Sequence, residues 1–169
     1  MTTFSTPIAD AGVVAVAELC AAARAHREYG ERHGTLHPQV WQELAESPLP
    51  RAALPSEFGG LGWSAPQLLE AVREVSAADP AAGWVAAIHG PAGAFLSRLD
   101  PSVTRDFAGR RLVVGGSSVP VGTTVRHGER VRLRGRWPLV TGAPSMTLAA
   151  LAAPTTGPDG VTVTRGIHR

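Results

Sequence analysis

The sequence predicts an α+β fold in which a mainly helical domain, residues 1–109, precedes a partial antiparallel β-domain, residues 110–169. Helix-start signals and apolar residues at helical spacing fill the first part. The apolar period changes to strict alternation in the second part, as in residues 130–134, which is typical of a strand with one solvated face. Helices followed by strands are typical of α+β proteins with separate layers.

The N-terminal sequence predicts one long helix and one short helix. Asp10 is a suitable cap for a helix that extends to about Arg32, and Gly30 and Gly34 mark its end. The pair His37 and Pro38 predicts the start of the short helix, because proline is well tolerated in a first turn.

Three further helix starts are visible between residues 47 and 110. Prolines and glycines predict a loop over residues 47–63. Ser64 with Gln67 three residues later is a capping-box pattern for the helix that follows. The pairs Asp79-Pro80 and Asp100-Pro101 are start signals of the same kind, a cap followed by proline, and the second predicts a short helix through Phe107. Residues 81–88 are nearly all apolar, which predicts a central, buried helix.

The second part carries short strand patterns separated by turns. The segments that favour strands are 112–114, 130–134, 137–141, 146–152 and 161–164. This is a small number of strands for a closed barrel, so we expect a partial β-domain with exposed edges. Such edges predict an oligomer or a complex with another chain.

Composition excludes several classes of function. All 16 basic residues are arginine, which removes Schiff-base lysine chemistry and phosphate-loop lysines. The single cysteine, Cys20, cannot form an internal disulfide. Neither a secretory signal nor a membrane-spanning apolar run is visible, so we expect a soluble, cytoplasmic protein without a membrane partner. No nucleophile elbow or dinucleotide-binding glycine motif is present.

Charge is divided unevenly along the chain. Residues 1–100 hold 6 arginines and 11 acidic residues, whereas residues 101–169 hold 10 arginines and 3 acidic residues. The arginine series from 126 to 136 would place several guanidinium groups on one strand face, but aromatic residues for base stacking are not interleaved with it. We therefore expect a solvated or subunit-facing strand and no nucleic acid.

Three histidines lie close together in sequence, namely His26, His33 and His37. A metal site needs three or four ligands, usually with carboxylate or thiolate partners, and glycines interrupt the spacing here. We expect solvated helix surface rather than a metal site.

Four motifs in order carry a resemblance to a known family. Residues 54–62, LPSEFGGLG, look like the L-P-x-E-x-G-G-x-G loop of the acyl-CoA dehydrogenase superfamily. Residues 77–84, AADPAAGW, resemble the A-A-D-P-S-x-G-W segment of its two-component flavin-dependent monooxygenase branch. Residues 117–123 and 135–142 are similar to the S-x-x-P-x-G-x-A and G-R-W-x-F-x-S-G stretches of that branch. The resemblance covers residues 10–153.

The resemblance implies a flavin cofactor, FMN or FAD, and a small organic or acyl substrate. Ser118 occupies the position of a hydroxyl against the flavin pyrimidine edge. The stretch that packs on the isoalloxazine ring and bonds near its N5 holds Trp137, Leu139, Val140 and Thr141. Trp84 lies on the central helix beneath the substrate and flavin cavity, and Ile88 follows it one turn later.

The sequence also departs from the family pattern. Leu139 stands where the family has phenylalanine, and Ser118-Val119-Pro120 replaces the T-E-P of the dehydrogenase branch. On this resemblance we expect the chain to lack the family's C-terminal helical bundle, which supplies the catalytic base, half of the flavin site and the tetramer core. No residue is assigned as a catalytic acid or base.

The resemblance therefore implies a flavin-dependent oxidoreductase of the monooxygenase type that needs a partner chain and binds flavin poorly alone. An acyl-CoA dehydrogenase-type fragment, a non-catalytic accessory protein and a truncated chain without independent function remain alternatives. We also expect Trp84 and Ile88 to be buried in the helical core.

Overall fold

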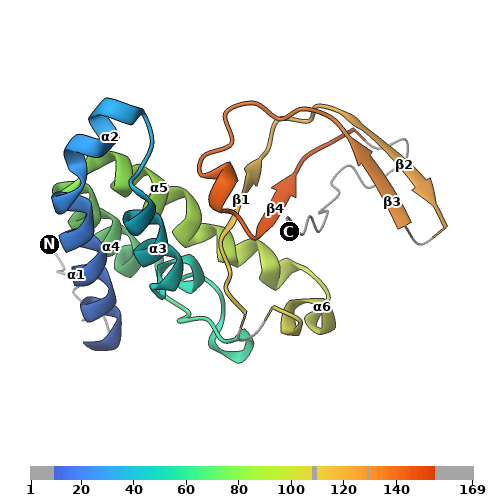
Figure 1. The fold of residues 1–169 in the computed structure, drawn as a ribbon. Helices are drawn as coiled ribbons and strands as arrows, with labels where there is room; N and C mark the ends of the chain where they lie inside the picture. The colour runs from blue at the N-terminus through green and yellow to red at the C-terminus, as the bar shows by residue number, and fades with distance from the viewer. Residues whose placement is uncertain (1–9, 108–109, 129, 155–169) are drawn as a thin grey trace, which may run out of the picture. The chain divides into compact units, whose positions relative to one another are not determined.

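The computed structural model describes residues 10–107, 110–128 and 130–154 (Figure 1). Contacts divide the chain into two compact units, Met1–Val113 and Val114–Arg169. The domain boundary expected at residues 109 and 110 falls beside residues outside the described ranges. A helical first unit and short strands in the second confirm the predicted fold class.

The first unit consists of helices joined by short irregular segments. Its α-helices are α1 (Asp10–Ala25), α2 (Arg27–His33), α3 (Pro38–Glu46), α4 (Ala65–Ala78), α5 (Pro80–Ala92) and α6 (Pro101–Arg105). Its 3-10 helices are η1 (Leu49–Arg51), η2 (Ser56–Phe58) and η3 (Gly93–Arg98). The long helix predicted from Asp10 to Arg32 is two helices, because the backbone leaves helical geometry at His26, where φ is −113° and ψ is 14°.

The caps predicted from sequence are present. Asp79 accepts hydrogen bonds from the backbone N–H groups of Ala81 and Ala82 at 2.6 and 3.1 Å, which satisfies two donors at the start of α5. The predicted capping box of Ser64 and Gln67 is formed at the start of α4, with each side chain accepting the backbone N–H of the other residue. These local signals fix where the two central helices begin.

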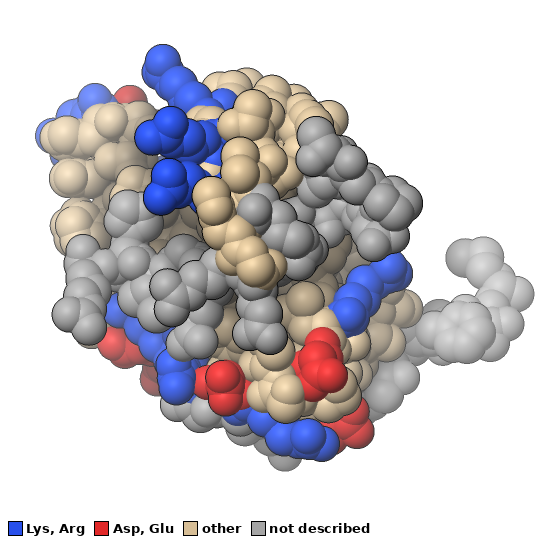
Figure 2. Space-filling model, turned by 90° about the vertical axis from the view of Figure 1, so that its right-hand side faces the viewer, with Lys and Arg blue, Asp and Glu red and all other residues tan. Residues whose placement is uncertain are grey.

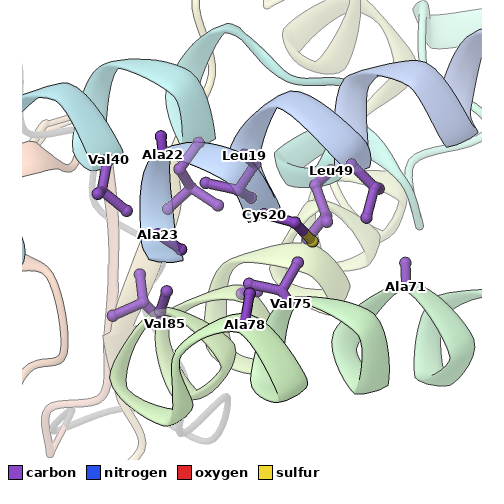
Figure 3. Close-up of a cluster of buried hydrophobic side chains, with 14 of the residues drawn as sticks. Leu19, Cys20, Ala22, Ala23, Val40, Leu49, Ala71, Val75, Ala78 and Val85 are labelled. Atoms are coloured by element: carbon purple, nitrogen blue, oxygen red, sulfur yellow. The ribbon is translucent and has the colours of Figure 1, made fainter. Parts of the chain in front are cut away.

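The core of the first unit lies between α1, α3, α4 and α5 (Figure 3). Leu19 and Cys20 from α1 face Val75 and Ala78 from α4, and Val85 from α5 closes the cluster (Figure 3). Many of the buried residues are alanines, whose small side chains let neighbouring helices approach closely.

One arginine side chain in the loop between α3 and α4 forms hydrogen bonds to distant backbone carbonyls. The Arg51 guanidinium donates to the backbone carbonyls of Gly59 at 3.2 Å, of Phe107 at 2.8 Å and of Arg110. Burial lowers the pKa of Arg51 from its ordinary value. The arginine thus joins residues that are more than 50 positions apart in the chain.

The second unit contains two separate pairs of strands. The strands β1 (Val114–Ser117) and β4 (Leu148–Leu151) are parallel, whereas β2 (Thr123–His127) and β3 (Arg130–Arg134) form an antiparallel hairpin (Figure 1). The antiparallel expectation was therefore wrong for β1 and β4. The chain between them, residues 118–147, is long enough for the crossover that a parallel pair requires.

Other strand predictions had mixed outcomes. The strand predicted at 146–152 is confirmed as β4, and the strand predicted at 112–114 begins only at Val114. The segment 137–141 is not a strand, because it contains Pro138 and a Leu139 with positive φ. The predicted strand 161–164 lies outside the described residues.

Candidate functional site

The segment expected to contact a flavin ring begins with an anchored tryptophan. The Trp137 indole N–H donates to the carbonyl of Ala152 at 2.8 Å. The same Ala152 donates its backbone N–H to the carbonyl of Ser117 at 2.9 Å. One residue after β4 thus links Trp137 to the end of β1, directly before Ser118. The structure therefore brings the 117–118 and 137 regions onto one short stretch of backbone.

Leu139 has the most unusual conformation in this segment. Its φ is +57°, the left-handed region that residues other than glycine rarely adopt, and its side chain is 99% exposed. Pro138 before it lacks a backbone N–H, so the two residues cannot continue a strand ladder. An apolar side chain held outward at a cost of about 1 kcal/mol is a feature that points to function.

The other residues predicted to contact flavin differ in how far they are exposed. Val140 and Thr141 are half-buried, and Gly142 follows with a φ of +68°. Ser118 is exposed directly after β1, and its neighbour Val119 is 53% exposed. Val119 was not predicted as a site residue, although its position inside the 117–123 motif could have indicated it.

In the first unit, the prediction that Trp84 is buried is wrong. Trp84 is 62% exposed on α5, and Ile88 one turn later is half-buried. The buried sides of α5 are formed by small residues, among them Ala82 and Gly83, which bring α4 close and leave the tryptophan on the remaining face. Truncation of Trp84 should therefore cost less than about 1 kcal/mol of stability, rather than the larger loss of a core aromatic.

A second exposed aromatic residue near Trp84 in sequence was missed. Trp84, Ile88, Pro91 and Phe95 follow one another at helical spacing along α5 and η3, and Phe95 is 59% exposed. The spacing i, i+4, i+7, i+11 was visible in the sequence, but in an all-apolar helix it did not stand out from the other faces.

The three neighbouring histidines form ring contacts. The rings of His26 and His37 stack with centroids 3.8 Å apart, and Tyr29 lies edge-on to His37 at 4.8 Å. His33 stacks on Tyr29 at 4.0 Å. Among the described residues, no group of three or more His, Cys, Asp or Glu could hold a metal ion.

His37 also caps α3, and this predicts a pH-dependent stability. Its Nδ1 accepts the backbone N–H of Gln39 at 3.1 Å, which requires an unprotonated nitrogen. Burial and the nearby His26 lower the pKa of His37. A lowered pKa means that the unfolded chain binds the proton more readily, so this contribution to stability is present above about pH 6.5 and is lost as the pH falls.

Urea unfolding at several pH values between 7.5 and 5 checks this expectation. His37→Asn keeps a capping side chain that does not titrate, so its midpoint should fall less with decreasing pH than that of the wild type. Identical pH profiles for the two proteins would contradict the proposed role of His37.

A comparison with known families decides the family of the chain. Residues 11–99 match the family described as acyl-CoA dehydrogenase, N-terminal domain. The chain belongs to the acyl-CoA dehydrogenase superfamily. The matched residues include the loop of residues 54–62 and helices α4 and α5, so the resemblance drawn from these motifs is confirmed.

Relatives of this superfamily member include enzymes named as monooxygenases. Indole-3-acetate monooxygenase from Acinetobacter baumannii is 31% identical over 105 residues, which cover 61% of this chain and 27% of that protein. The 3-HSA hydroxylase from Rhodococcus sp. RHA1 has a similar fold, with a TM-score of 0.77 and 21% identity over 92% of this chain and 41% of that one. XiaF from Streptomyces sp., in complex with FADH2 and glycerol, gives a TM-score of 0.75 and 22% identity over 92% and 40%.

The superfamily chain described here thus spans less than half the length of these relatives. Among its described residues, no helix is long and apolar enough to cross a membrane.

Proposed function

We propose that this chain is part of a flavin-dependent monooxygenase in which Ser118, Trp137, Leu139, Val140 and Thr141 hold the flavin ring. A reduced flavin held there would supply the two electrons needed for O2 to give one oxygen atom to the substrate and one to water. The residues of this chain bind and orient the ring and keep water from its face. The proposal assigns no catalytic acid or base.

The observation that carries the proposal is the exposure of Leu139. A flavin ring needs an apolar wall and a few placed hydrogen-bond donors. Leu139 presents almost its whole side chain outward from a left-handed backbone conformation. Ser118 offers an exposed hydroxyl and Val119 a second exposed apolar side chain. These residues fit the chemistry of a flavin ring, and the relative crystallised with FADH2 supports the same cofactor class.

The substrate is proposed to contact the exposed apolar residues of α5. Trp84 and Ile88 are the residues expected there, and Phe95 is a further exposed aromatic residue on η3, which follows α5. An aromatic wall suits a small apolar or aromatic organic substrate. The relative named indole-3-acetate monooxygenase supports an aromatic acid as the first compound to test.

We further infer that the site is completed by additional polypeptide, in a homo-oligomer or a hetero-complex, and that the chain alone binds flavin weakly. Ligand sites bury most of their ligand, whereas Leu139 and Ser118 are exposed here. FMN and FAD both remain compatible with the ring contacts. A cytoplasmic location is part of the proposal, in keeping with the single, buried Cys20.

An acyl-CoA dehydrogenase-type activity is the second candidate, because the matched family carries that name. The sequence Ser118-Val119-Pro120 favours the monooxygenase branch over it. Anaerobic bleaching of bound flavin by acyl-CoA thioesters would identify the dehydrogenase type. An accessory protein without enzyme activity would bind no flavin in any assembly.

Flavin titration of a Leu139 variant tests the proposal. Leu139→Asp should weaken binding of FMN and FAD by about tenfold or more, since a buried leucine contributes about 1.5–3 kcal/mol. Aspartate tolerates the left-handed region, and the side chain is exposed, so folding should be preserved. The visible absorbance of the flavin reports the binding.

Leu69→Asp is the matched control, because Leu69 is also a leucine with an exposed side chain, at 67%, but lies on α4. It should leave the affinity unchanged. Equal affinities for the Leu139 variant and the wild type would overturn the assignment of the ring site.

A further inference from the structure

One face of the β2–β3 hairpin carries two exposed arginines. Arg132 and Arg134 are two residues apart on β3, so both side chains leave the same face. The register places Val125 opposite Arg132 and Thr123 opposite Arg134, and all four side chains are exposed. These four residues are called the arginine face below.

The other face of the hairpin is directed toward its own unit. Thr124 donates its hydroxyl to the carbonyl of Pro154 at 2.8 Å. Thr124 and its partner Leu133 are half-buried. The arginine face is therefore the outer side of this hairpin within the second unit.

No described carboxylate neutralises these arginines. The described part of the second unit, residues 114–128 and 130–154, contains no Asp or Glu. The ion pairs formed by described residues join helical side chains of the first unit only: Arg27–Glu31, Arg32–Glu28 and Arg73–Glu70. Figure 2 shows arginine side chains in small groups, some beside carboxylates and some away from them.

We propose that the arginine face binds the diphosphate group of a nucleotide, an inference that rests on the proposed flavin function and would make FAD the preferred flavin. A guanidinium group can donate two parallel hydrogen bonds to phosphate oxygens. Two arginines about 7 Å apart along one strand face repel each other until an anion lies between them. A diphosphate carries the charge for both, and the Thr123 hydroxyl can donate a further hydrogen bond.

The position of the face agrees with a ligand whose ring lies on Leu139. Leu139 follows Arg134 by five positions, so their backbones are at most about 17 Å apart. An extended dinucleotide covers such a distance. Coenzyme A contains the same diphosphate chemistry and is the other possible source of the group.

A nucleic acid fits this face less well. Binding of single strands uses aromatic side chains on which bases stack, and the arginine face contains none. The nearest aromatic residue in sequence, Trp137, is half-buried and donates to Ala152. The arginine face is thus suited to phosphate groups without base stacking.

Calorimetric titration of the chain with ADP, FAD, FMN and coenzyme A tests the inference. We expect ADP to bind with a Kd on the order of 1 mM or below and FAD to bind about tenfold more tightly than FMN. The double variant Arg132→Gln/Arg134→Gln should abolish ADP binding and reduce the FAD affinity to that of FMN. Arg132→Lys/Arg134→Lys should retain part of it, and Arg98→Gln, an exposed arginine of the first unit, should change nothing.

The outcomes separate this inference from the proposed function. ADP binding that is lost in the glutamine variant, with FAD bound no more tightly than ADP and FMN not bound at all, would support the arginine face and count against the ring site. Tighter binding of coenzyme A than of FAD would support the face with the other source of diphosphate. Equal FAD and FMN affinities that the glutamine variant leaves unchanged would overturn the arginine face and leave the ring site standing. A single-stranded oligonucleotide bound far more tightly than ADP would also overturn it.

Discussion

Gly60→Ala is expected to lower the free energy of unfolding by about 3 kcal/mol, the upper part of the range for overpacked sites. A Cβ atom at this position would lie 1.9 Å from the carbonyl oxygen of Leu54 and 2.6 Å from its Cβ. Rotation of a side chain cannot relieve a clash with backbone. Leu54 is fully buried, and its carbonyl already accepts the N–H of Gly62 at 2.9 Å, so it cannot move freely.

Gly62→Ala in the same loop is the matched control. Gly62 has a φ of +60°, but the nearest atom to a Cβ there would be 3.9 Å away. It should cost only the strain of a left-handed residue, about 1–2 kcal/mol. Urea unfolding of the three proteins checks the order, and an equally mild effect of both substitutions would contradict the close approach at Gly60.

Gly83→Ala is expected to destabilise the protein by about 1–3 kcal/mol, although alanine is the better helix former by about 1 kcal/mol. A Cβ at Gly83 would lie 2.6 Å from the Cα of Ser76 on α4 and 2.1 Å from its Oγ. The steric cost is expected to exceed the gain in helix propensity, because α4 and α5 would have to separate. That separation would also disturb the packing beneath Trp84, the neighbouring residue.

Gly30→Ala is the same chemical change, but it is expected to stabilise the protein rather than destabilise it. Gly30 lies in α2, and the nearest atom to a Cβ there would be the carbonyl oxygen of Thr35 at 3.7 Å. Helix propensity should therefore decide, and the substitution should raise stability by about 0.5–1 kcal/mol. Thermal unfolding of both variants tests the pair; stabilisation by both would show that α4 and α5 can part without cost.

The structure explains why particular residues occur in the two family motifs of the first unit. In residues 77–84 the aspartate caps α5, the glycine admits α4, and the tryptophan is left exposed. In residues 54–62 one glycine avoids a backbone clash, and two others, Gly59 and Gly62, adopt positive φ. Each motif therefore fixes local backbone within the first unit.

Helix starts were predictable because their chemistry is local. Asp79 and Ser64 bond to N–H groups within three residues, so the sequence alone contains all the partners. The break at His26 was not visible in the same way. No proline stands there, and the change of geometry accompanies the stacking of His26 on the distant His37.

The features that sequence patterns missed depend on distant partners or on unusual backbone. The exposure of Trp84 follows from the choice of small residues for the helix contact, which an all-apolar pattern does not reveal. The parallel pairing of β1 with β4 joins residues more than 30 positions apart. The outward Leu139 breaks the predicted strand at 137–141, since its φ is positive.

The site residues came from the family resemblance rather than from apolar periodicity. No pattern in the sequence shows that Trp137 and Ser117 bond to the same residue, Ala152, because both bonds use its backbone atoms. Arg132 and Arg134 could be placed on one face from alternation alone. Their opposite neighbours, Thr123 and Val125, required the register of the hairpin.

We propose that a flavin ring lies on the segment around Leu139, and amide chemical shifts of the isotopically labelled chain test this placement residue by residue. During titration with FMN, a weak ligand suffices for this measurement. We predict shift changes that gather at Ser118 and at the amides of residues 137 and 139–142, and that are absent from α1 to α3. Shift changes confined to the helices, or none at FMN concentrations on the order of 1 mM, would contradict the claim.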